Sequence, residues 1–545
     1  MSTRPQTIIF TKRGCIHCEQ AKATLRDAGR AFFVTHDVDT DQRTADATTY
    51  FSGKGTIPQI FVGEYPIGGA DELAELWQTR RLRDIAHAVD PGAKLDIATH
   101  SSDELTRGAE DIKFIDHIPP SDGTHSDDPE QWPLLHFYKN FLGFWPNSFV
   151  YLHHWPEIYK RFVYCQNMAV VQLGKDILGK PLSSAINYAT SNAHGCNYCQ
   201  VHSVAAGGDA SLGAIEQLRL ARIGQRDADN PFDEYWVSLA DLAGMASLNT
   251  VPEHYLDRLQ QLAGHSVHNP DDFNAHLMAI ALRVSSFGFL NVFNDLVGMD
   301  IEGGWAAAAK ERLDIDFGRH GVNEARNPNN LSHDIPADGP TAEQMIGKYM
   351  AEVGDVTTYA THHFGLVPTW MQSFPARIRP LHVAFYNEVM RQQDNSSLSA
   401  ELKHLLAYVS HIEKGHMTLA TTEAFIAHHV AEDRPRTLQR LQHSFAVASG
   451  RGGDIALFRE AERAALRLAY LSAQIPLITP RRFVQPVIDQ FDTKTCIELF
   501  VVCSIASLIQ RFAAIIQPAP DQTIAAFVRE HGLSTDTLTM RFPIL

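Results

Sequence analysis

The chain has 545 residues, of which 44% are hydrophobic and 20% are charged, as in an ordinary folded globular protein. This length is sufficient for about three domains, each with its own core. The formal net charge of −16 argues against nucleic acid or an anionic membrane as a partner. Seven cysteines, four of them in two Cys-x-x-Cys pairs, favour reactive thiols in a reducing cytoplasm over a disulfide-stabilised secreted fold.

The start of the chain also favours a cytoplasmic location. Residues 1–6 lead directly into a strand pattern, so we expect no signal peptide. The longest apolar segment, 499–509, is too short to span a bilayer and predicts a buried helix.

The first 87 residues alternate between strand and helix patterns. Strands are expected at 7–11, 31–34 and 56–62, with helices at 19–25 and from 68–73 onward. A Cys-Ile-His-Cys motif lies between the first strand and the first helix. This order predicts a thioredoxin-like α/β layer in an N-terminal domain at 1–87.

Three motifs of this domain resemble the glutaredoxin family over about 85 residues. They are Cys15-Ile16-His17-Cys18, Thr56-Ile57-Pro58 and Gly68-Gly69-Ala70-Asp71. The resemblance implies a cis peptide bond before Pro58 and a glutathione site formed by Lys12, Ile57, Pro58, Gly69, Ala70 and Asp71. Taken alone, Lys12 and Asp71 would be solvated surface charges.

Cys15 begins the predicted helix, so we expect it to be the low-pKa nucleophile of the pair, with Cys18 as its partner. Lys12 or Arg13, and His17 when protonated, would favour its thiolate.

Two polar segments divide the rest of the chain. Residues 88–131 are rich in Asp, Ser, Gly and Pro and predict a linker, whose root-mean-square span as a flexible chain is roughly 35 Å. Residues 319–345 predict a second linker. Helical periodicity, clearest at 173–178 and 277–297, predicts helical domains at 132–318 and 346–530, followed by a tail at 531–545.

The second thiol motif, Cys196-Asn197-Tyr198-Cys199, follows Gly195 in the first helical domain. If a helix begins at Cys196, both sulfurs lie near its N-terminus, where unpaired amide groups favour a thiolate. His202 then shares a helix face with both cysteines and can move a proton for Cys199; His194 is a weaker candidate. A structural zinc half-site and two core thiols are the alternatives.

The string Gly-Cys-x-Tyr-Cys, followed by a histidine and a small-residue helix, resembles the alkyl hydroperoxidase D-like branch of the carboxymuconolactone decarboxylase family. The resemblance implies an all-α domain whose cysteines cycle between dithiol and disulfide while reducing a peroxide. It implies Cys199 as the nucleophile and Cys196 as the resolving thiol, whereas the helix dipole alone favours Cys196.

Two positions depart from this family pattern. Ser203 stands where the family has its histidine, one residue after His202. The family's relay glutamate, expected about a dozen residues before the first cysteine, is missing from Leu182-Ser183-Ser184-Ala185. These departures weaken the prediction of peroxidase activity more than that of redox-active thiols.

The two helical domains align at a constant offset of 219 residues, which predicts an internal repeat. The matching pairs include Pro156 with Pro375, Ser191 with Ser410, Ala205 with Ala424 and Phe293 with Phe512. Under this alignment Cys196, Cys199 and His202 correspond to Gly415, Thr418 and Thr421. The second copy therefore lacks the thiols. The family resemblance implies that the copies pair as a pseudo-dimer within one chain.

The remaining cysteines and histidines predict no further site. Cys496 and Cys503 share a helix face about 10 Å apart, so we expect core thiols there and at Cys165. The 27 histidines show no His-Glu-x-x-His or comparable spacing, so no metal is expected.

Two dithiol motifs on one chain predict a glutathione-linked thiol-disulfide oxidoreductase. In this hypothesis, the N-terminal pair rereduces a Cys196–Cys199 disulfide after that pair has reduced a hydroperoxide or another small oxidised substrate. Tethering gives an effective concentration of the order of mM. A cysteine-independent lyase or isomerase acting on a lactone, and a non-enzymatic redox sensor, are the alternatives. The oligomeric state stays open.

Overall fold

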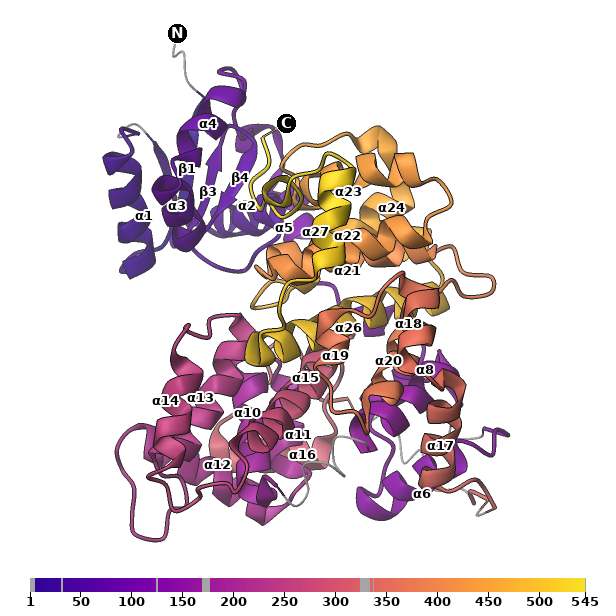
Figure 1. Cartoon of the computed structure of the whole chain (residues 1–545). Helices are drawn as coiled ribbons and strands as arrows, with labels where there is room; N and C mark the ends of the chain where they lie inside the picture. Colours follow the sequence, from indigo (N-terminus) through magenta and orange to yellow (C-terminus); the bar gives the residue numbers. More distant parts are fainter. Residues whose placement is uncertain are drawn as a thin grey trace. The chain divides into compact units, whose positions relative to one another are not determined.

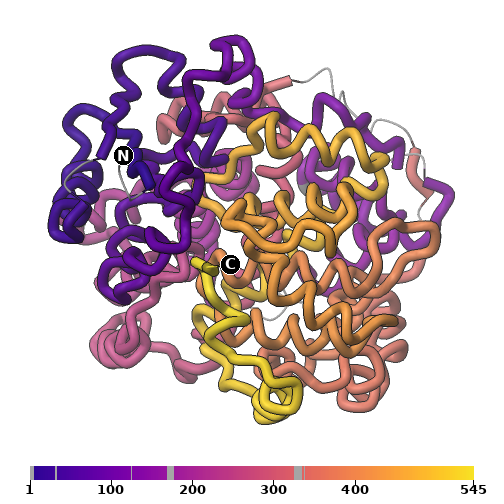
Figure 2. The backbone as a smooth tube through the Cα atoms, turned by 90° about the horizontal axis from the view of Figure 1, so that it is seen from above, coloured from indigo at the N-terminus to yellow at the C-terminus, as the bar shows by residue number. Residues whose placement is uncertain are grey.

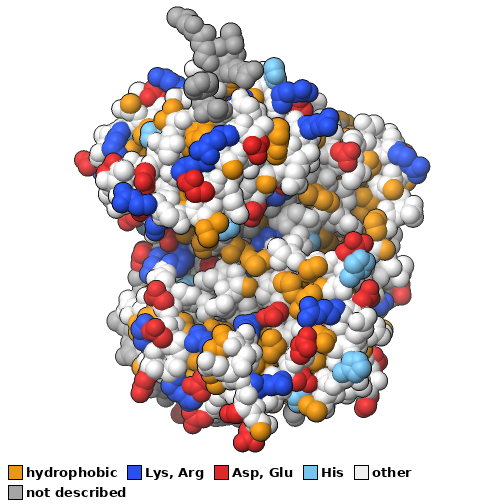
Figure 3. Space-filling model, turned by 90° about the vertical axis from the view of Figure 1, so that its left-hand side faces the viewer, with side chains coloured by type: hydrophobic (Ala, Val, Ile, Leu, Met, Phe, Trp, Pro, Cys, Tyr) orange, Lys and Arg blue, Asp and Glu red, His pale blue; other side chains and the backbone are white. Residues whose placement is uncertain are grey.

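The computed structural model describes residues 5–30, 33–123, 126–168, 177–323, 334–336 and 338–544. Its backbone divides into two compact units (Figure 1). The N-terminal unit comprises Met1–Ile112, Asp433–Phe491 and Leu533–Leu545, and the helical unit comprises Lys113–Glu432 and Asp492–Gly532. On the face drawn in Figure 3, acidic and basic side chains are interspersed and hydrophobic ones form small groups.

The N-terminal unit is built on a four-stranded sheet of order β2-β1-β3-β4. β1 pairs parallel with β2, and β3 runs antiparallel to both β1 and β4. Because this sheet carries helices on both faces, the predicted thioredoxin-like layer is confirmed. The strands are β1 (Thr7–Thr11), β2 (Val34–Asp37), β3 (Gln59–Val62) and β4 (Tyr65–Gly68). The second expected strand begins at Val34, and residues 31 and 32 lie outside the described residues.

Side chains of β1 alternate between two apolar cores. Ile9 packs with residues of α1 (Ile16–Asp27) and α3 (Ala70–Gln78) on one face. Ile8 and Phe10 pack with α2 (Gln42–Ser52) and α5 (Ser102–Ala109) on the other. The unit also contains α4 (Arg81–Ala88), η1 (Ile97–Thr99), α23 (Arg434–Ser449), η6 (Ile455–Leu457), α24 (Glu460–Ser472), α25 (Arg481–Gln490) and α28 (Thr535–Leu538).

The predicted linker at 88–131 is folded where the structure describes it. α5 packs against α2 and α25, and its Leu105 is fully buried. In the helical unit, Phe114 and Ile115 of η2 (Phe114–Asp116) are buried as well. A few apolar side chains therefore hold this segment in the fold although its composition is polar. The prediction of a flexible linker is wrong here, and the span calculated for a flexible chain does not apply.

The C-terminal tail is also part of a core. Phe542 is buried in the cluster that contains Ile9. The Tyr65 hydroxyl donates to the Pro543 carbonyl (2.9 Å), and Arg81 donates to the Phe542 carbonyl (2.7 Å). Figure 2 shows this yellow end of the chain returning to the unit in which the chain starts.

The helical unit is organised around α15 (Phe273–Val297), which packs along α26 (Thr493–Ile516). Both are long and apolar enough to cross a membrane, yet 78% and 94% of their most apolar windows are buried, as in core helices. The other helices are α6 (Trp132–Phe141), α7 (Asn147–Leu152), α8 (Pro156–Arg161), η4 (Phe162–Met168), α10 (Gly179–His194), α11 (Asn197–Ala205), α12 (Asp209–Arg222), α13 (Glu234–Leu248), α14 (Tyr255–Ala263), α16 (Gly303–Leu313), α17 (Ala342–Val353), α18 (Val356–Phe364), α19 (Thr369–Gln372), α20 (Arg379–Met390), α21 (Ala400–Glu413), α22 (Met417–Val430) and α27 (Gln522–Glu530).

Helix order repeats at the predicted offset. α10 and α21 end at corresponding residues, and α15 and α16 correspond closely to α26 and α27. One buried side-chain hydrogen bond also repeats: Ser191 with Asn291 (3.2 Å) and Ser410 with Gln510 (3.0 Å). However, α23–α25 belong to the N-terminal unit, whereas α12–α14, their counterparts, belong to the helical unit. Common ancestry of the two copies stays a prediction.

Two predictions fall largely on undescribed residues. Most of the apolar run at 173–178 lies within 169–176, and the second linker includes 324–333 and 337.

Candidate functional site

Strand register places the three N-terminal motifs at one edge of the sheet. Phe10 pairs with Gln59, so the end of β1 lies beside the start of β3. Ile60 pairs with Gly68, which brings the end of β4 to the same edge. Cys15 follows β1, Pro58 precedes β3 and Gly69 follows β4. The peptide bond before Pro58 is cis, as the resemblance implied.

Cys15 is the N-cap of α1, and its sulfur accepts the backbone N–H of Cys18 (3.1 Å). The two cysteines form a disulfide. Cys15 is half-buried while Cys18 is fully buried, so Cys15 presents the sulfur that a partner can reach. This accessibility supports Cys15 as the attacking thiol after reduction.

The residues predicted to bind glutathione differ in exposure. Lys12 and Asp71 are exposed, Ile57, Gly69 and Ala70 are half-buried, and Pro58 is buried. Gly69 caps α3, with its N–H bound by Glu72 (2.9 Å). Their roles toward glutathione stay a prediction, as does any effect of the exposed Arg13 and His17 on the Cys15 thiolate.

The second thiol motif has the same local geometry. Gly195 ends α10 with a φ of 87°, a conformation that favours glycine. Cys196 is the N-cap of α11, so the helix begins at Asn197, one residue later than expected, and the Cys196 sulfur accepts the Cys199 N–H (3.4 Å). Both are free thiols and almost completely buried, with 0% and 2% exposed.

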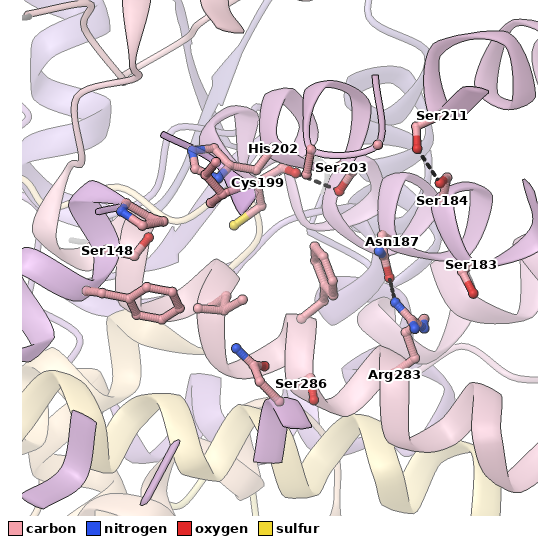
Figure 4. A pocket seen from close by; sticks show the side chains of 18 of the residues that line it. Ser148, Ser183, Ser184, Asn187, Cys199, His202, Ser203, Ser211, Arg283 and Ser286 are labelled. Atoms are coloured by element: carbon pink, nitrogen blue, oxygen red, sulfur yellow. Dashed lines mark hydrogen bonds between the residues drawn. The ribbon is translucent and has the colours of Figure 1, made fainter. Parts of the chain in front are cut away.

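The two cysteines differ in their position relative to a cavity of about 890 Å³. Cys199 lines it together with His202, and Cys196 does not. Figure 4 shows the Cys199 sulfur on the cavity side of α11. A small substrate in this cavity therefore reaches Cys199, with Cys196 behind it. This placement agrees with the roles implied by the family resemblance rather than with the helix-dipole argument.

His202 is paired with Glu302, a carboxylate that the sequence did not reveal. The two side chains are 2.7 Å apart. Glu302 also accepts the Asn147 N–H (2.9 Å) and the Tyr198 hydroxyl (3.0 Å). Burial alone would raise the pKa of Glu302, but its partners, His202 foremost, hold it below the usual value. The site therefore has an ionised carboxylate that orients His202.

Ser203 does not replace the family's histidine. Its hydroxyl donates to the Cys199 carbonyl (2.7 Å) within α11. The imidazole of His202, one residue earlier, lies between the Tyr198 and Trp305 rings, with centroids at 4.2 and 4.7 Å. His202 is thus held firmly beside the cavity.

Asn294 of α15 donates its amide N–H to the Cys199 sulfur (3.3 Å). The orientation of this amide is set by Ser148, whose hydroxyl donates to the Asn294 oxygen (2.7 Å). These two hydrogen bonds fix the position of the Cys199 sulfur at the cavity wall.

Behind Cys196 lies a buried group formed by His194, Asp295 and His320. Asp295 is 2.9 Å from His320 and 3.3 Å from His194. Burial opposes the ionised form of Asp295, but the two imidazoles outweigh it and lower its pKa. His320 lies at the start of the second predicted linker and is 3% exposed. That part of the segment therefore belongs to the site.

Arg511 of α26, a helix within the second predicted helical domain, reaches this group. Its guanidinium donates to Nδ1 of His194 (2.8 Å), so Nδ1 is unprotonated and the proton of the neutral ring sits on Nε2, facing Asp295. Burial, with a further contribution from Arg511, lowers the pKa of His194 to about 4. Gly288 leaves room for Arg511, since a Cβ there would lie 2.7 Å from its Cδ.

Burial dominates the ionisation of Cys196. Together with Cys199 and Asp295, burial raises the pKa of this thiol well above its usual value. Cys196 therefore rests as a neutral thiol, as expected for a group that attacks only after its neighbour has been oxidised.

Cys196, Asp295 and His320 have ligand atoms within 4.8 Å of one another, and these are residue types that bind zinc. Both nitrogens of His320 already face oxygen acceptors, the Met299 carbonyl (2.8 Å) and Asp295 (2.9 Å). These hydrogen bonds account for the position of His320 without a metal ion. The metal content of the purified protein is a direct check.

Some of the site residues found only in the structure share one sequence signal. Asn294 and Asp295 are polar positions within an otherwise apolar helix, and both are almost fully buried. Buried polar residues need partners, so this pattern marks a site. Arg511 is likewise a buried polar residue within the apolar helix α26, whereas Glu302 precedes α16 and gives no such signal.

The other cysteines are placed as expected. Cys165, Cys496 and Cys503 are buried in the helical unit and form no disulfide. The positions aligned with the thiol motif, Thr418 and Thr421, lie in α22, where Thr421 donates to the Met417 carbonyl (3.2 Å).

Comparison with known proteins shows that the N-terminal part of the chain is similar in sequence to glutaredoxins. A glutaredoxin family profile matches residues 7–67. Glutaredoxin 3 of Escherichia coli K12 is 37% identical over 68 residues, which cover 12% of this chain and 81% of that protein. Glutaredoxin 1 of Rickettsia typhi is 33% identical over 79 residues, covering 14% and 73%.

Two further matches cover very different shares of the matched proteins. Hybrid peroxiredoxin hyPrx5 of Haemophilus influenzae is 41% identical over 68 residues, but the match spans only 26% of that protein and 12% of this chain. The solution structure of glutaredoxin from Brucella melitensis is 31% identical and covers 17% of this chain and 98% of that chain, with a TM-score of 0.15.

Proposed function

Because the chain belongs to the glutaredoxin family through its N-terminal domain, we propose that it is a glutathione-linked thiol peroxidase whose peroxide site is Cys199. The observation that carries the proposal is the placement of Cys199 on a cavity wall beside the His202–Glu302 pair, with Cys196 directly behind it. A relative named as a hybrid peroxiredoxin shares the glutaredoxin-like segment, which supports a link to peroxide chemistry.

In the first step the Cys199 thiolate attacks the terminal oxygen of a hydroperoxide. The O–O bond breaks, Cys199 becomes a sulfenic acid, and the alkoxide leaves. His202, paired with Glu302, accepts the Cys199 proton and returns it to the alkoxide, which departs as the alcohol. The Asn294 amide holds the attacking sulfur. Glu302 takes the role of the glutamate that is missing from 182–185.

In the second step the Cys196 sulfur attacks Cys199. A disulfide forms, and the sulfenic oxygen leaves as water with the Cys196 proton. His194 and Asp295 lie on the Cys196 side, where a proton is released. The substrate has then accepted two electrons.

In the third step Cys15 attacks the Cys196–Cys199 disulfide, and Cys18 resolves the mixed disulfide. Two glutathione molecules reduce Cys15–Cys18 and leave as glutathione disulfide, so that one hydroperoxide and two glutathiones give an alcohol, water and glutathione disulfide. Because Cys196 and Cys199 are buried, this exchange requires the cavity to open. We place the cycle in a reducing cytoplasm.

We also propose that the helical repeat is a pair of alkyl hydroperoxidase D-like copies in which only the first is redox-competent. Repetition of helix order and of the Ser191–Asn291 bond supports this. In the second copy the buried Glu423 binds His404 (2.6 Å) and Tyr386 (2.8 Å) instead of flanking a thiol.

The decisive assay follows NADPH oxidation by glutathione reductase with full-length protein, glutathione and several hydroperoxides. We expect peroxide-dependent turnover that Cys199→Ser abolishes. Absence of turnover with all hydroperoxides, or turnover that survives Cys199→Ser, contradicts the proposal. Lactone turnover by the double variant Cys196→Ser/Cys199→Ser would support the lyase alternative instead.

The relay is tested separately by trapping. Cys18→Ser combined with Cys196→Ser should leave a mixed disulfide between Cys15 and Cys199, visible as a cross-linked peptide by mass spectrometry after proteolysis. The same peptide should be absent when Cys15→Ser is added. If neither Cys196→Ser nor Cys199→Ser gives a cross-link in the Cys18→Ser background, glutathione itself must reduce the helical site.

A further inference from the structure

The cavity beside Cys199 contains a half-buried cation that has no carboxylate partner among the described residues. Arg283 of α15 lines the cavity, and its Nη1 donates a hydrogen bond to the Asn187 oxygen (3.4 Å). Its Nε is buried without a partner. Burial lowers the pKa of Arg283 to about 10, so the side chain stays protonated at neutral pH.

Removing a cation from water without an anionic partner is unfavourable unless a ligand compensates its charge. Lys180, exposed at the same cavity, has no ion pair among the described residues either. No Asp or Glu is among the described residues that line the cavity, although the whole chain carries a net charge of −16. On the side of Arg283 and Lys180, away from the His202–Glu302 pair, the described lining therefore carries positive charge alone, which favours an anion there.

The remaining walls are apolar. Aromatic and aliphatic side chains from several helices face the same space: Phe137, Tyr138, Leu142, Phe149, Val163, Phe287 and Leu290. Cys199 on α11 and Arg283 on α15 lie on different walls (Figure 4). A ligand that satisfies both features has an apolar body and one anionic end.

The second copy lacks this polarity. Arg283 aligns with Val502 at the offset of 219, Asn187 with Leu406 and Ser183 with Leu402. All three replacements are apolar and buried in the helical unit. Of the two aligned domains, the one with the thiols therefore has the charged lining. This is expected of residues that bind a substrate, and not of residues that the helical fold itself requires.

We propose that the substrate of Cys199 is an amphipathic anion, a hydroperoxide whose apolar chain fills the cavity and whose carboxylate pairs with Arg283. This inference rests on the peroxidase proposed above and adds the substrate class. Lys180 guides the anionic group at the exposed part of the cavity. Arg283 is a specificity residue and takes no part in breaking the O–O bond.

The test compares three hydroperoxides with the full-length protein: linoleic acid hydroperoxide, its methyl ester and cumene hydroperoxide. Wild-type protein should prefer the acid over the ester. Arg283→Met, which removes the charge at similar size, should raise the KM for the acid about 10- to 100-fold. The KM for the ester and for cumene hydroperoxide should change less than about threefold. Arg283→Lys should restore most of the preference. Arg258→Met, at an exposed arginine of α14, is the matched control.

Binding of linoleate, which has no peroxide group, separates this inference from the proposed activity. Isothermal titration should show that linoleate binds to wild-type protein and to Cys199→Ser, and at least tenfold more weakly to Arg283→Met. If hydroperoxides are reduced but neither linoleate binding nor acid preference depends on Arg283, the inference is wrong and the peroxidase stands. If linoleate binds through Arg283 but no hydroperoxide is reduced, the anion site stands and the peroxidase is wrong.

Discussion

The two Cys-x-x-Cys motifs have the same local geometry and opposite accessibility. In each, the first cysteine caps a helix and its sulfur accepts the N–H of the second, at 3.1 Å in α1 and 3.4 Å in α11. In the N-terminal unit the first cysteine is accessible and the second is buried. In the helical unit the second cysteine lines a cavity and the first lies behind it. Local sequence sets the cap, and tertiary packing decides which sulfur a substrate meets.

Serine substitutions test this reversal with the largest expected effect. Cys199→Ser should lower peroxide turnover roughly 1,000-fold or more, because serine cannot replace the thiolate nucleophile. Cys196→Ser should keep a single turnover per protein, measured as a stopped-flow burst, and accumulate a sulfenic acid. In the N-terminal unit the order reverses: Cys15→Ser loses reduction of a glutathionylated substrate and Cys18→Ser keeps part of it. A burst in Cys199→Ser but not in Cys196→Ser would show that the roles are assigned the wrong way round.

Alkylation rates test the accessibility of the four cysteines in the two motifs without any mutation. In the fully reduced protein, iodoacetamide should modify Cys15 first and Cys199 more slowly through the cavity. Cys18 and Cys196 should react roughly 100-fold more slowly than Cys15, because both are fully buried and Cys196 also has a raised pKa. Peptide mass spectrometry at timed intervals measures all four rates. Fast labelling of Cys196 would contradict the placement of that thiol behind Cys199.

Glu302→Gln tests the proton path of the helical site. The substitution keeps the size of the side chain and removes the charge that orients and balances His202, so kcat/KM for peroxide should fall roughly 10- to 100-fold. The pH profile should change as well, which a purely structural defect would not produce. Asp521→Asn is the matched control, because Asp521 occupies the aligned position and likewise caps a helix, α27. If Glu302→Gln and Asp521→Asn behave alike, the carboxylate has no role in proton transfer.

Motif spacing predicted most of the N-terminal domain because its determinants are local. Residues 7–11 form β1 as expected, and the cis bond before Pro58 is present. The folded state of 88–131 was missed, since Leu105 acts through a partner helix that composition does not reveal. Linker prediction from polarity fails where a few apolar residues pack well.

Sequence reasoning also identified the four cysteines and His202, but not the groups that tune them. Motifs mark residues that lie close together in the chain, whereas Glu302, Asp295 and Arg511 reach the thiols through helix packing. The absent glutamate at 182–185 therefore did not mean an absent carboxylate. Only the packing of α11 against α15 and α16 brings a carboxylate, that of Glu302, beside His202.

Buried histidines distinguish the helical unit further and predict how its stability depends on pH. Burial lowers the pKa values of His153, His194, His276 and His382 to about 4. The Tyr235 hydroxyl is 2.8 Å from Nδ1 of His276 and donates to it in the neutral ring. In the unfolded chain such a histidine titrates near pH 6.5. Between about pH 4 and 6.5 the unfolded state therefore binds a proton that the folded state excludes.

Each such histidine should weaken folding as the pH falls through this window, by about 1.4 kcal/mol per pH unit, and should have no effect above it. His276→Gln removes one of these groups, so the free energy of unfolding should depend less steeply on pH by that amount. Urea titrations of the full-length protein between pH 4.5 and 7.5, followed by circular dichroism, measure the slope independently of any overall loss of stability. His254→Gln is the control, because the His254 side chain is 84% exposed and its replacement should leave the slope unchanged. An equal slope in wild type and His276→Gln would mean that His276 accepts a proton in the folded state, and that its burial against Tyr235 does not keep it neutral.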